Sequence, residues 1–367
     1  MPTRRHFLAG AAASVTVAGC MGGMRPVETE DAARRLLARH PSFDLHAHPG
    51  RSFVRGAQNL SPAVEAFISA GPSEETAVAD MAAGGMSAAV FCAVADLQVL
   101  DQDGYALVAK RQFHPGEARA SYATQLASLD AMVAHGLVER ILDADDLVRI
   151  HKSGAVGAML GVEGGDFLEG SASRVAEAHA DGVRCITPVH YHSNELGDTI
   201  TASPTHGGLT PSGQACIKAM NRTGIIVDIS HASEATAFGM IEASDKPVIC
   251  SHAHIQTPDL QSARFISPDL AKAVTATGGV VGAWPAGIGI TDLDGFIDRI
   301  FELVDLVGIE HVAIGTDMDA NFMPVWDNYR QFPDVISRLG KRGLQEADIS
   351  RIIGANGLRV LREVQVL

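Results

Sequence analysis

The chain reads FDLHAHPG at residues 43–50, so a short apolar run ends in two histidines two residues apart. In a strand, residues i and i+2 point to the same face, which directs His46 and His48 at one point beyond the strand's carboxyl end. Two imidazole nitrogens aimed at one point can begin a metal site. A chain with 15 histidines also produces such a pair by chance, so its meaning depends on the other strands.

Composition excludes several classes of protein. The chain has 367 residues, of which 46% are hydrophobic and 20% charged, enough for two domains or for one large α/β barrel. Its net charge is −14, and no basic cluster lies outside the N-terminus, which disfavours nucleic-acid binding. The sequence has no run of 18 or more apolar residues, so it predicts no ordinary membrane span.

The first 20 residues are typical of an export signal. Arg4 and Arg5 precede a short apolar run, as in a twin-arginine signal, and residues 17–20 (VAGC) resemble a lipobox. We expect export to the periplasm or cell envelope, with Cys20 as a lipid anchor to the membrane. The alternative is a buried amphipathic N-terminal helix. Residues 21–41 are predicted to form a tether with a short helix, and residues 42–367 a single catalytic domain.

Eight strand-like runs recur along the chain, separated by segments long enough for crossover helices. They are near-continuously hydrophobic, as expected of parallel strands covered on both faces. Eight such units predict a (β/α)8 TIM barrel rather than an open sheet. Residues 50–72 and 96–119 are predicted loop insertions, and residues 344–366 one or two closing helices. The strand runs are 42–48, 86–95, 155–163, 183–190, 224–231, 247–252, 278–284 and 311–317, and the clearest helices are 73–83, 211–223 and 292–306.

Histidines and carboxylates follow most of these runs at their carboxyl ends. One such residue is most simply the first polar residue of a loop, but in a barrel all these ends meet at one mouth. The set is His46, His48, Glu163, His190, His231, His252 and Asp317.

Six of these residues form a chemically sensible ligand set, namely the four histidines His46, His48, His231 and His252 with the carboxylates of Glu163 and Asp317. Nitrogen and oxygen ligands without thiolate suit Zn²⁺, with Mn²⁺ or Co²⁺ as substitutes. Six ligands are enough for two ions if one carboxylate bridges them.

Several segments together resemble the renal (membrane) dipeptidase family of the amidohydrolase superfamily, and the chain is similar to a bacterial exported member. The resemblance covers essentially the whole chain after the N-terminal signal. It is carried by FDLHAH (43–48), GVEGG (161–165), RCITPVH (184–190), GLTPSG (208–213), VDISHAS (227–233), PVICSH (247–252), HVAIGTD (311–317) and NGLRV (356–360).

The resemblance implies a metal-dependent amidohydrolase barrel with two zinc ions and assigns roles to the residues. Glu163 would bridge the ions. One ion would be held by His46, His48 and Asp317, and the other by His231 and His252. His190 would bind the scissile carbonyl, and Arg264 the substrate's terminal carboxylate. Mammalian members of this family have Asp where this chain has His48. Family likeness alone also suggests a homodimer.

The implied activity is hydrolysis of dipeptides, including ones with a C-terminal D-residue. A hydroxide held between the metals would attack the peptide carbonyl, with Asp317 carrying the proton to the leaving amine. Two alternatives remain. One is a related metal barrel acting on another amide or a lactone, and the other is an exported binding lipoprotein without turnover.

Weaker expectations concern residues near the mouth. Asn194 and Asp198 are candidates to contact a substrate amine, with an Asx turn as the alternative. Asp228 and Asp319 are expected to support the ligands. His192, His206 and His254 are expected to be solvated loop residues, and Trp284 and Trp326 to be core or pocket wall. Buried thiols are predicted at Cys92, Cys185, Cys216 and Cys250.

Overall fold

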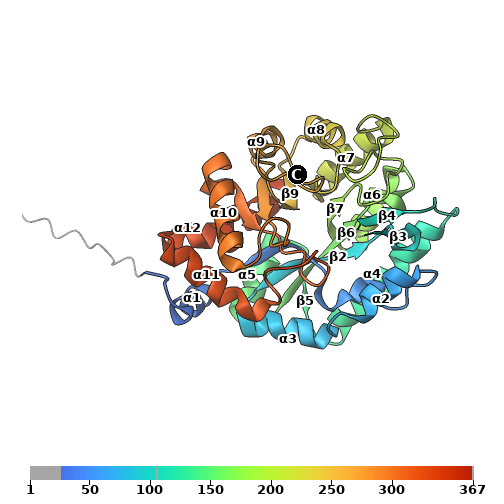
Figure 1. The fold of residues 1–367 in the computed structure, drawn as a ribbon. Coiled ribbons are helices and arrows are strands. Elements are labelled where there is room, and N and C mark those ends of the chain that lie inside the picture. Colours follow the sequence, from blue (N-terminus) through green and yellow to red (C-terminus); the bar gives the residue numbers. More distant parts are fainter. Residues whose placement is uncertain (1–25, 105, 366–367) are drawn as a thin grey trace, which may run out of the picture.

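The computed structural model describes residues 26–104 and 106–365 (Figure 1). The predicted export signal and lipid anchor at residues 1–20 lie outside this part of the chain. Within the described residues, no helix is both long enough and apolar enough to span a bilayer.

Eight parallel strands close into a barrel. Hydrogen bonding follows the order β2-β1-β11-β10-β9-β8-β7-β6, and β2 also pairs with β6, which closes the ring. All eight predicted runs contain one of these strands, so the predicted TIM barrel is confirmed. The strands are β1 (Phe43–Ala47), β2 (Ala88–Val94), β6 (Gly157–Glu163), β7 (Val183–Thr187), β8 (Ile226–Asp228), β9 (Val248–Ala253), β10 (Val280–Ala283) and β11 (Val312–Ile314).

Helices surround the barrel (Figure 1), and their starts follow from local sequence. Ser73, Thr210 and Asp292 accept a hydrogen bond from the third backbone N–H after them, as N-caps do. The helices are α1 (Glu30–Leu37), α2 (Pro62–Ser69), α3 (Glu74–Gly84), α4 (Glu117–Ala134), α5 (Ala144–Ser153), α6 (Ser173–Ala180), α7 (Pro211–Thr223), α8 (Glu234–Ala243), α9 (Pro268–Ala276), α10 (Leu293–Val307), α11 (Phe332–Lys341), α12 (Glu346–Ser350) and α13 (Asn356–Gln365).

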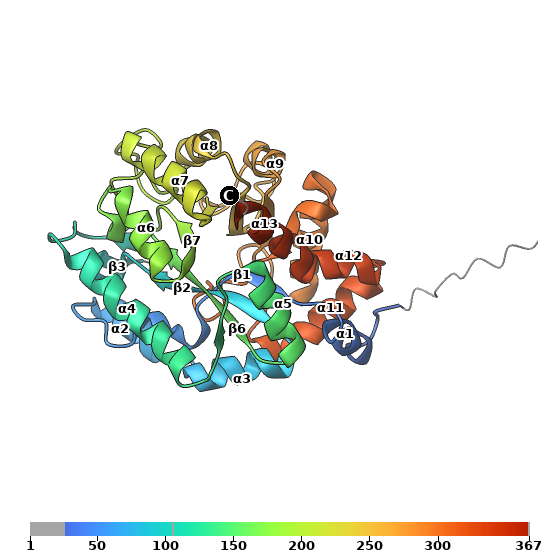
Figure 2. The same ribbon diagram turned by 180° about the vertical axis from the view of Figure 1, so that it is seen from behind.

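The barrel interior is a packed apolar core. Every one of the eight strands contributes at least one buried side chain to it, for example Phe43 from β1 and Met159 from β6. Leu361 of α13 and Leu147 of α5 belong to the same cluster, and Figure 2 shows these two helices across the back of the barrel. The packed core and the two helices fill the end where the strands begin, so the functional groups gather at the end where they finish.

The two predicted loop insertions contain regular structure. Residues 50–72 include a 3-10 helix (Pro49–Val54) and α2, and residues 96–119 include a hairpin of β3 (Leu100–Asp103) and β4 (Ala106–Ala109). Within both insertions the chain thus forms short elements of its own, which the sequence did not predict. A two-residue strand, β5 (Glu139–Arg140), also pairs with β6.

Candidate functional site

Glu163, the last residue of β6, lies at the centre of the site and is 3% exposed. The Nε2 atoms of five histidines surround its carboxylate. The distances to the nearest carboxylate oxygen are 3.3 Å for His46, 3.5 Å for His48, 3.4 Å for His190, 3.0 Å for His231 and 3.7 Å for His252. Residues from five strand ends thus meet around one buried carboxylate.

Two groups of possible metal ligands share Glu163. One contains His46 and His48, and the other contains His231 and His252. Within each group the Nε2 atoms are 3.1 and 3.0 Å apart. Ligand atoms held about 2.0–2.1 Å from a tetrahedral ion lie roughly 3.3 Å from one another. The donor set therefore fits two ions with Glu163 between them. The sixth predicted ligand, Asp317, has its Oδ1 3.4 Å from the Nε2 of His48.

A cationic side chain already occupies one of these positions. The Nη2 of Arg264 lies 2.8 Å from the Nε2 of His231 and 3.0 Å from that of His252. Guanidinium can only donate, so both imidazoles present lone pairs to it. The guanidinium thus stands where a metal cation of the second group would bind.

His48 is oriented as a metal ligand. Its Nδ1 lies 2.9 Å from the backbone carbonyl of Cys92, which can only accept a hydrogen bond. That contact places a proton on Nδ1 and directs Nε2 into the cluster. Its partner His46 has its Nδ1 3.4 Å from both the Sγ of Cys92 and the hydroxyl of Ser251.

Asp228 supports the cluster from beneath. Its carboxylate accepts hydrogen bonds from the hydroxyls of Thr187 and Ser251, at 2.8 and 2.6 Å, and from the backbone N–H groups of Ser230 and Ser251. The Ser251 hydroxyl lies 2.9 Å from the Nδ1 of His252. Asp228 could also be grouped with His46 and His252 as a metal ligand, but its oxygens are taken up by these bonds. It is therefore a supporting residue, as the sequence predicts.

Asp96 is a buried residue of the site that sequence reasoning missed. Its Oδ1 is 2.7 Å from the Nδ1 of His190, and its Oδ2 accepts the backbone N–H groups of Tyr191 and His192. The signal was present, because Asp96 is the first polar residue after the predicted strand at 86–95, as the other site residues are after theirs. It falls within the predicted loop insertion at residues 96–119.

The charges of the cluster depend on one another. Burial alone would raise the pKa of Glu163, but His190, His46 and His231 hold it well below its usual range. Burial acts to lower the pKa of His48, yet contacts with Asp317 and Glu163 raise it to about 10. Burial and Arg264 lower the pKa values of His231 and His252. Positive charge is thus favoured beside His48, and neutral imidazoles face the second position.

Two site residues have backbone conformations that L-residues rarely adopt. His231 has φ 65° and Asp317 has φ 54°. Such angles are costly and are retained where the surroundings enforce them. At His231, the carbonyl accepts from the backbone N–H of Ile200 and the hydroxyl of Thr199, which fixes the turn.

Asn194 and Asp198 have structural contacts in place of the predicted substrate contacts. Both oxygens of Asp198 accept hydrogen bonds from the loop at residues 205–208. Asn194 accepts from the backbone N–H of Leu196, which is the alternative Asx turn, and donates to Asp166 and Pro188. Neither side chain is left to hold a substrate amine, so we do not assign them to substrate binding.

Other expectations near the mouth had mixed outcomes. His206 is exposed as predicted, but His192 and His254 are buried and pair with Asp166 and Glu302, so that prediction was wrong for them. Trp326 is core, whereas the Trp284 ring lies 5.2 Å from the Arg264 guanidinium. Asp319 accepts from the backbone of Gly50 and so holds the loop after β1. The four internal cysteines are buried free thiols, as predicted.

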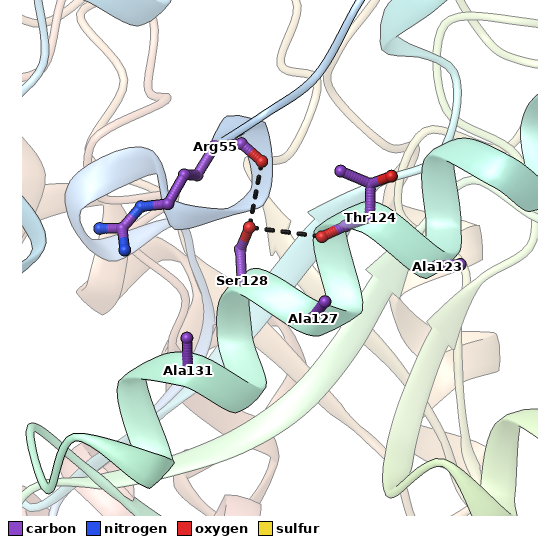
Figure 3. Close-up of a pocket in the computed structure, with 6 residues that line it drawn as sticks. All are labelled: Arg55, Ala123, Thr124, Ala127, Ser128 and Ala131. Atoms are coloured by element: carbon purple, nitrogen blue, oxygen red, sulfur yellow. Dashed lines mark hydrogen bonds between the residues drawn. The ribbon is translucent and has the colours of Figure 1, made fainter.

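Two surface recesses lie outside the histidine cluster. One is a shallow depression over α4, lined by Arg55 and small side chains such as Ala127 and Ser128 (Figure 3). It holds no titratable group except Arg55, so it offers no catalytic chemistry. The other lies beside His192 and Asp166 and is walled by residues 112–116.

Comparison with known proteins identifies the family. The model of "Membrane dipeptidase (Peptidase family M19)" matches residues 30–367. Dipeptidase verJ of Clonostachys rogersoniana is 32% identical over 67% of this chain and 67% of its own length. Dipeptidase tcpJ of Claviceps purpurea is 30% identical over 68% of this chain and 64% of its own length, so the alignment spans less than two thirds of that relative.

Solved structures show the same fold. The probable dipeptidase PvdM from Pseudomonas aeruginosa aligns with a TM-score of 0.76 at 20% identity, over 92% of this chain and 98% of that one. A metallo peptidase from Rhodobacter sphaeroides, liganded with a phosphinate mimic of the dipeptide L-Ala-D-Ala, aligns with a TM-score of 0.74 at 19% identity, over 89% and 99%. The fold, the buried histidine cluster and the family match agree, and the chain belongs to the membrane dipeptidase family, peptidase family M19.

Proposed function

We propose that the protein is a zinc-dependent dipeptidase with two metal ions. The observation that carries this proposal is the pair of three-residue ligand groups that share the buried carboxylate of Glu163. Zinc is favoured because the donors are imidazole nitrogens and carboxylate oxygens without a thiolate, and Mn²⁺ or Co²⁺ could substitute. The intact cluster argues against a barrel that has become a binding lipoprotein without turnover.

The chain's own residues divide the work of peptide hydrolysis. Two bound metal ions would lower the pKa of a water and polarise the scissile carbonyl. His190, whose Nε2 lies 3.4 Å from the carboxylate of Glu163, would stabilise the carbonyl oxygen as it becomes an oxyanion. Asp317 adjoins His48 but lies outside both three-residue groups, so its carboxylate is available to take the proton and return it to the leaving amine.

Arg264 indicates that the substrate has a free carboxylate. Its guanidinium is half-buried between His231, His252 and Trp284, at the edge of the cluster. Bidentate pairing with a C-terminal carboxylate is the strongest neutralising contact available to it, and this pairing would move the guanidinium off the two histidines. A terminal D-residue is proposed because the Rhodobacter sphaeroides structure holds a mimic of L-Ala-D-Ala.

The cellular setting belongs to the same proposal. The twin-arginine and lipobox-like features of residues 1–20 support export to the periplasm or cell envelope, with an anchor at Cys20. A homodimer rests on family likeness alone. Palmitate labelling of the wild-type protein and of Cys20→Ser tests the anchor, and label retained by the variant would exclude Cys20.

The activity is tested with metal-free protein reloaded with Zn²⁺, Mn²⁺ or Co²⁺. We expect hydrolysis of L-Ala-L-Ala and L-Ala-D-Ala, and at least 100-fold weaker hydrolysis of L-Ala-D-Ala amide, which lacks the carboxylate that Arg264 would bind. A lactone and a β-lactam are assayed in parallel. Turnover of those substrates without any dipeptide hydrolysis would overturn the proposal in favour of another amidohydrolase activity.

A further inference from the structure

We propose that Asp96 is a positioning residue that acts through His190, holding the imidazole so that its Nε2 faces the reacting carbonyl. This inference rests on the function proposed above for His190. Asp96 is the second residue after β2 and is 0% exposed, while His190 is 5% exposed. Their contact of 2.7 Å joins two strand ends that are 94 residues apart in the sequence.

The three hydrogen bonds of Asp96 need both of its carboxylate oxygens. Oδ1 faces the Nδ1 of His190, and Oδ2 accepts the backbone N–H groups of Tyr191 and His192, each at 3.0 Å. A carboxylate only accepts hydrogen bonds, so the proton of the first contact lies on Nδ1. The same carboxylate therefore fixes the backbone of the loop and the rotation of the ring that the loop carries.

The direction of the ring decides what Asp96 can influence. With Nδ1 directed at Asp96, the Nε2 of His190 lies 3.4 Å from Glu163, in the centre of the histidine cluster. Without Asp96, the Nδ1–H group of His190 would be buried without an acceptor, which costs free energy. The ring could reduce that cost only by turning away. Asp96 thus places the catalytic nitrogen without touching the substrate.

Asparagine at this position cannot satisfy all three contacts. Its amide has one accepting oxygen, and the two backbone N–H groups of Tyr191 and His192 cannot change from donors to acceptors. The oxygen is expected to remain with these two donors, which turns the NH₂ group of Asn toward the Nδ1 of His190. In Asp96→Asn the imidazole must then lose its Nδ1 proton or rotate.

A second carboxylate–histidine pair provides a matched control. Asp166 is the third residue after β6, and its Oδ1 is 2.6 Å from the Nδ1 of His192. The Nε2 of His192, however, faces Gln112 at 3.1 Å rather than Glu163. Asp166→Asn therefore makes the same chemical change beside a histidine that points away from the cluster.

Steady-state kinetics on L-Ala-D-Ala with zinc-loaded protein separates a positioning role from a purely structural one. We expect Asp96→Asn to lower kcat roughly 10- to 100-fold with KM changed less than threefold, as is typical when a hydrogen bond orienting a catalytic imidazole is lost. Asp166→Asn should lower kcat less than threefold. Equal losses in the two variants would overturn the inference.

A double-mutant cycle tests whether Asp96 acts through His190. In the His190→Ala background, Asp96→Asn should change kcat less than twofold, because the group that it orients is absent. The same 10- to 100-fold loss in that background would show that Asp96 acts on another part of the site and would contradict the proposal. Tm and metal content of each variant show whether the fold is retained.

Nitrogen-15 NMR of labelled histidines gives a readout that does not depend on activity or on the folding of Asp96→Asn. In wild-type protein the Nδ1 of His190, assigned by comparison with His190→Gln, should carry a proton in a strong hydrogen bond. An unprotonated Nδ1 would refute the inference even if Asp96→Asn fails to fold. Absence of dipeptide hydrolysis by the wild-type protein would instead refute the proposed function, and the NMR result would still decide the contact.

Discussion

His48 lies between two carboxylates at the centre of the site. Its Nε2 is 3.5 Å from Glu163 and 3.4 Å from Asp317, and its Nδ1 is held by the carbonyl of Cys92. An aspartate would bring a negative charge to the first metal position, whereas histidine brings a neutral nitrogen. The contact with the carbonyl of Cys92 fixes the orientation of the imidazole nitrogen. A carboxylate ligand would not need its orientation fixed in this way.

His48→Ala tests this residue as a ligand. We expect it to weaken binding of one of the two metal ions at least tenfold, because one of the three donors of that group is removed. Calorimetric titration of metal-free protein with Zn²⁺ measures the loss. His206→Ala, which removes an exposed histidine, is the control and should match the wild type. Two unchanged binding events in His48→Ala would exclude the residue as a ligand.

We predict that Asp198 makes a pH-dependent contribution to the free energy of unfolding. Burial alone would raise its pKa, but hydrogen bonds from the loop at 205–208 lower it from 3.8 to about 2. A carboxylate whose pKa is lower in the folded than in the unfolded state stabilises the protein at pH values above the unfolded-state pKa. This stabilisation is lost as the pH falls toward the folded-state pKa. The contribution is about 2 kcal/mol at neutral pH, of which roughly half is lost by pH 3.

Urea unfolding of wild type and Asp198→Asn, both kept metal-free by chelator, measures this effect at pH 6 and pH 3. The variant should be less stable at both values, because its amide has one acceptor for several donors. The difference should shrink by about 1 kcal/mol at the lower pH. A difference that does not change with pH would show that the charge of Asp198 contributes nothing.

At the scale of elements, β1 and β11 form the least extensive seam of the barrel among those with a described register. A single residue pair, Asp44 and Ile314, is in register between these strands. Asp44 supplements that seam, since its carboxylate accepts the hydroxyls of Thr316 at 2.5 Å and of Tyr329 at 2.8 Å. The seam carries His46 on one side and Asp317 on the other.

Tyr329→Phe removes one hydroxyl from this seam without changing the shape of the ring. We expect a loss of roughly 1–3 kcal/mol in the free energy of unfolding, since the acceptor is a buried carboxyl. Chemical denaturation measures the loss, with Thr316→Ser as a control that keeps its hydroxyl. If Tyr329→Phe is as stable as the wild type, the hydrogen bond from Tyr329 to Asp44 does not help to hold the barrel closed at this seam.

The sequence predicted most strands and ligands because both follow from short patterns. An apolar run that ends in histidine or glutamate marks a strand and its functional end together, as at Glu163 and His252. Asp96 was missed because the segment after it was predicted as a loop insertion, although a hairpin of β3 and β4 forms there. The contacts of Asp198 could not be predicted because they come from a loop seven residues onward, and spacing does not reveal them.

The whole molecule concentrates its metal donors in a mouth formed by separate strand ends. Donors on β1, β6, β8 and β9 are brought together only when the barrel closes, so metal binding and folding are coupled. Chelator should lower the Tm by roughly 5–10 °C relative to protein in a 100-fold excess of zinc over its Kd. Calorimetry with and without added Zn²⁺ measures the shift, and an unchanged Tm would exclude a metal that binds the folded state selectively.

The most direct test of the binuclear centre is the dependence of L-Ala-D-Ala hydrolysis on zinc equivalents. Metal-free protein is titrated with Zn²⁺ while hydrolysis and bound metal are measured on the same samples. The shared carboxylate of Glu163 predicts that activity is absent without metal and reaches its maximum at two ions per chain. Full activity in metal-free protein, or maximal activity at one ion per chain, would contradict a two-metal dipeptidase.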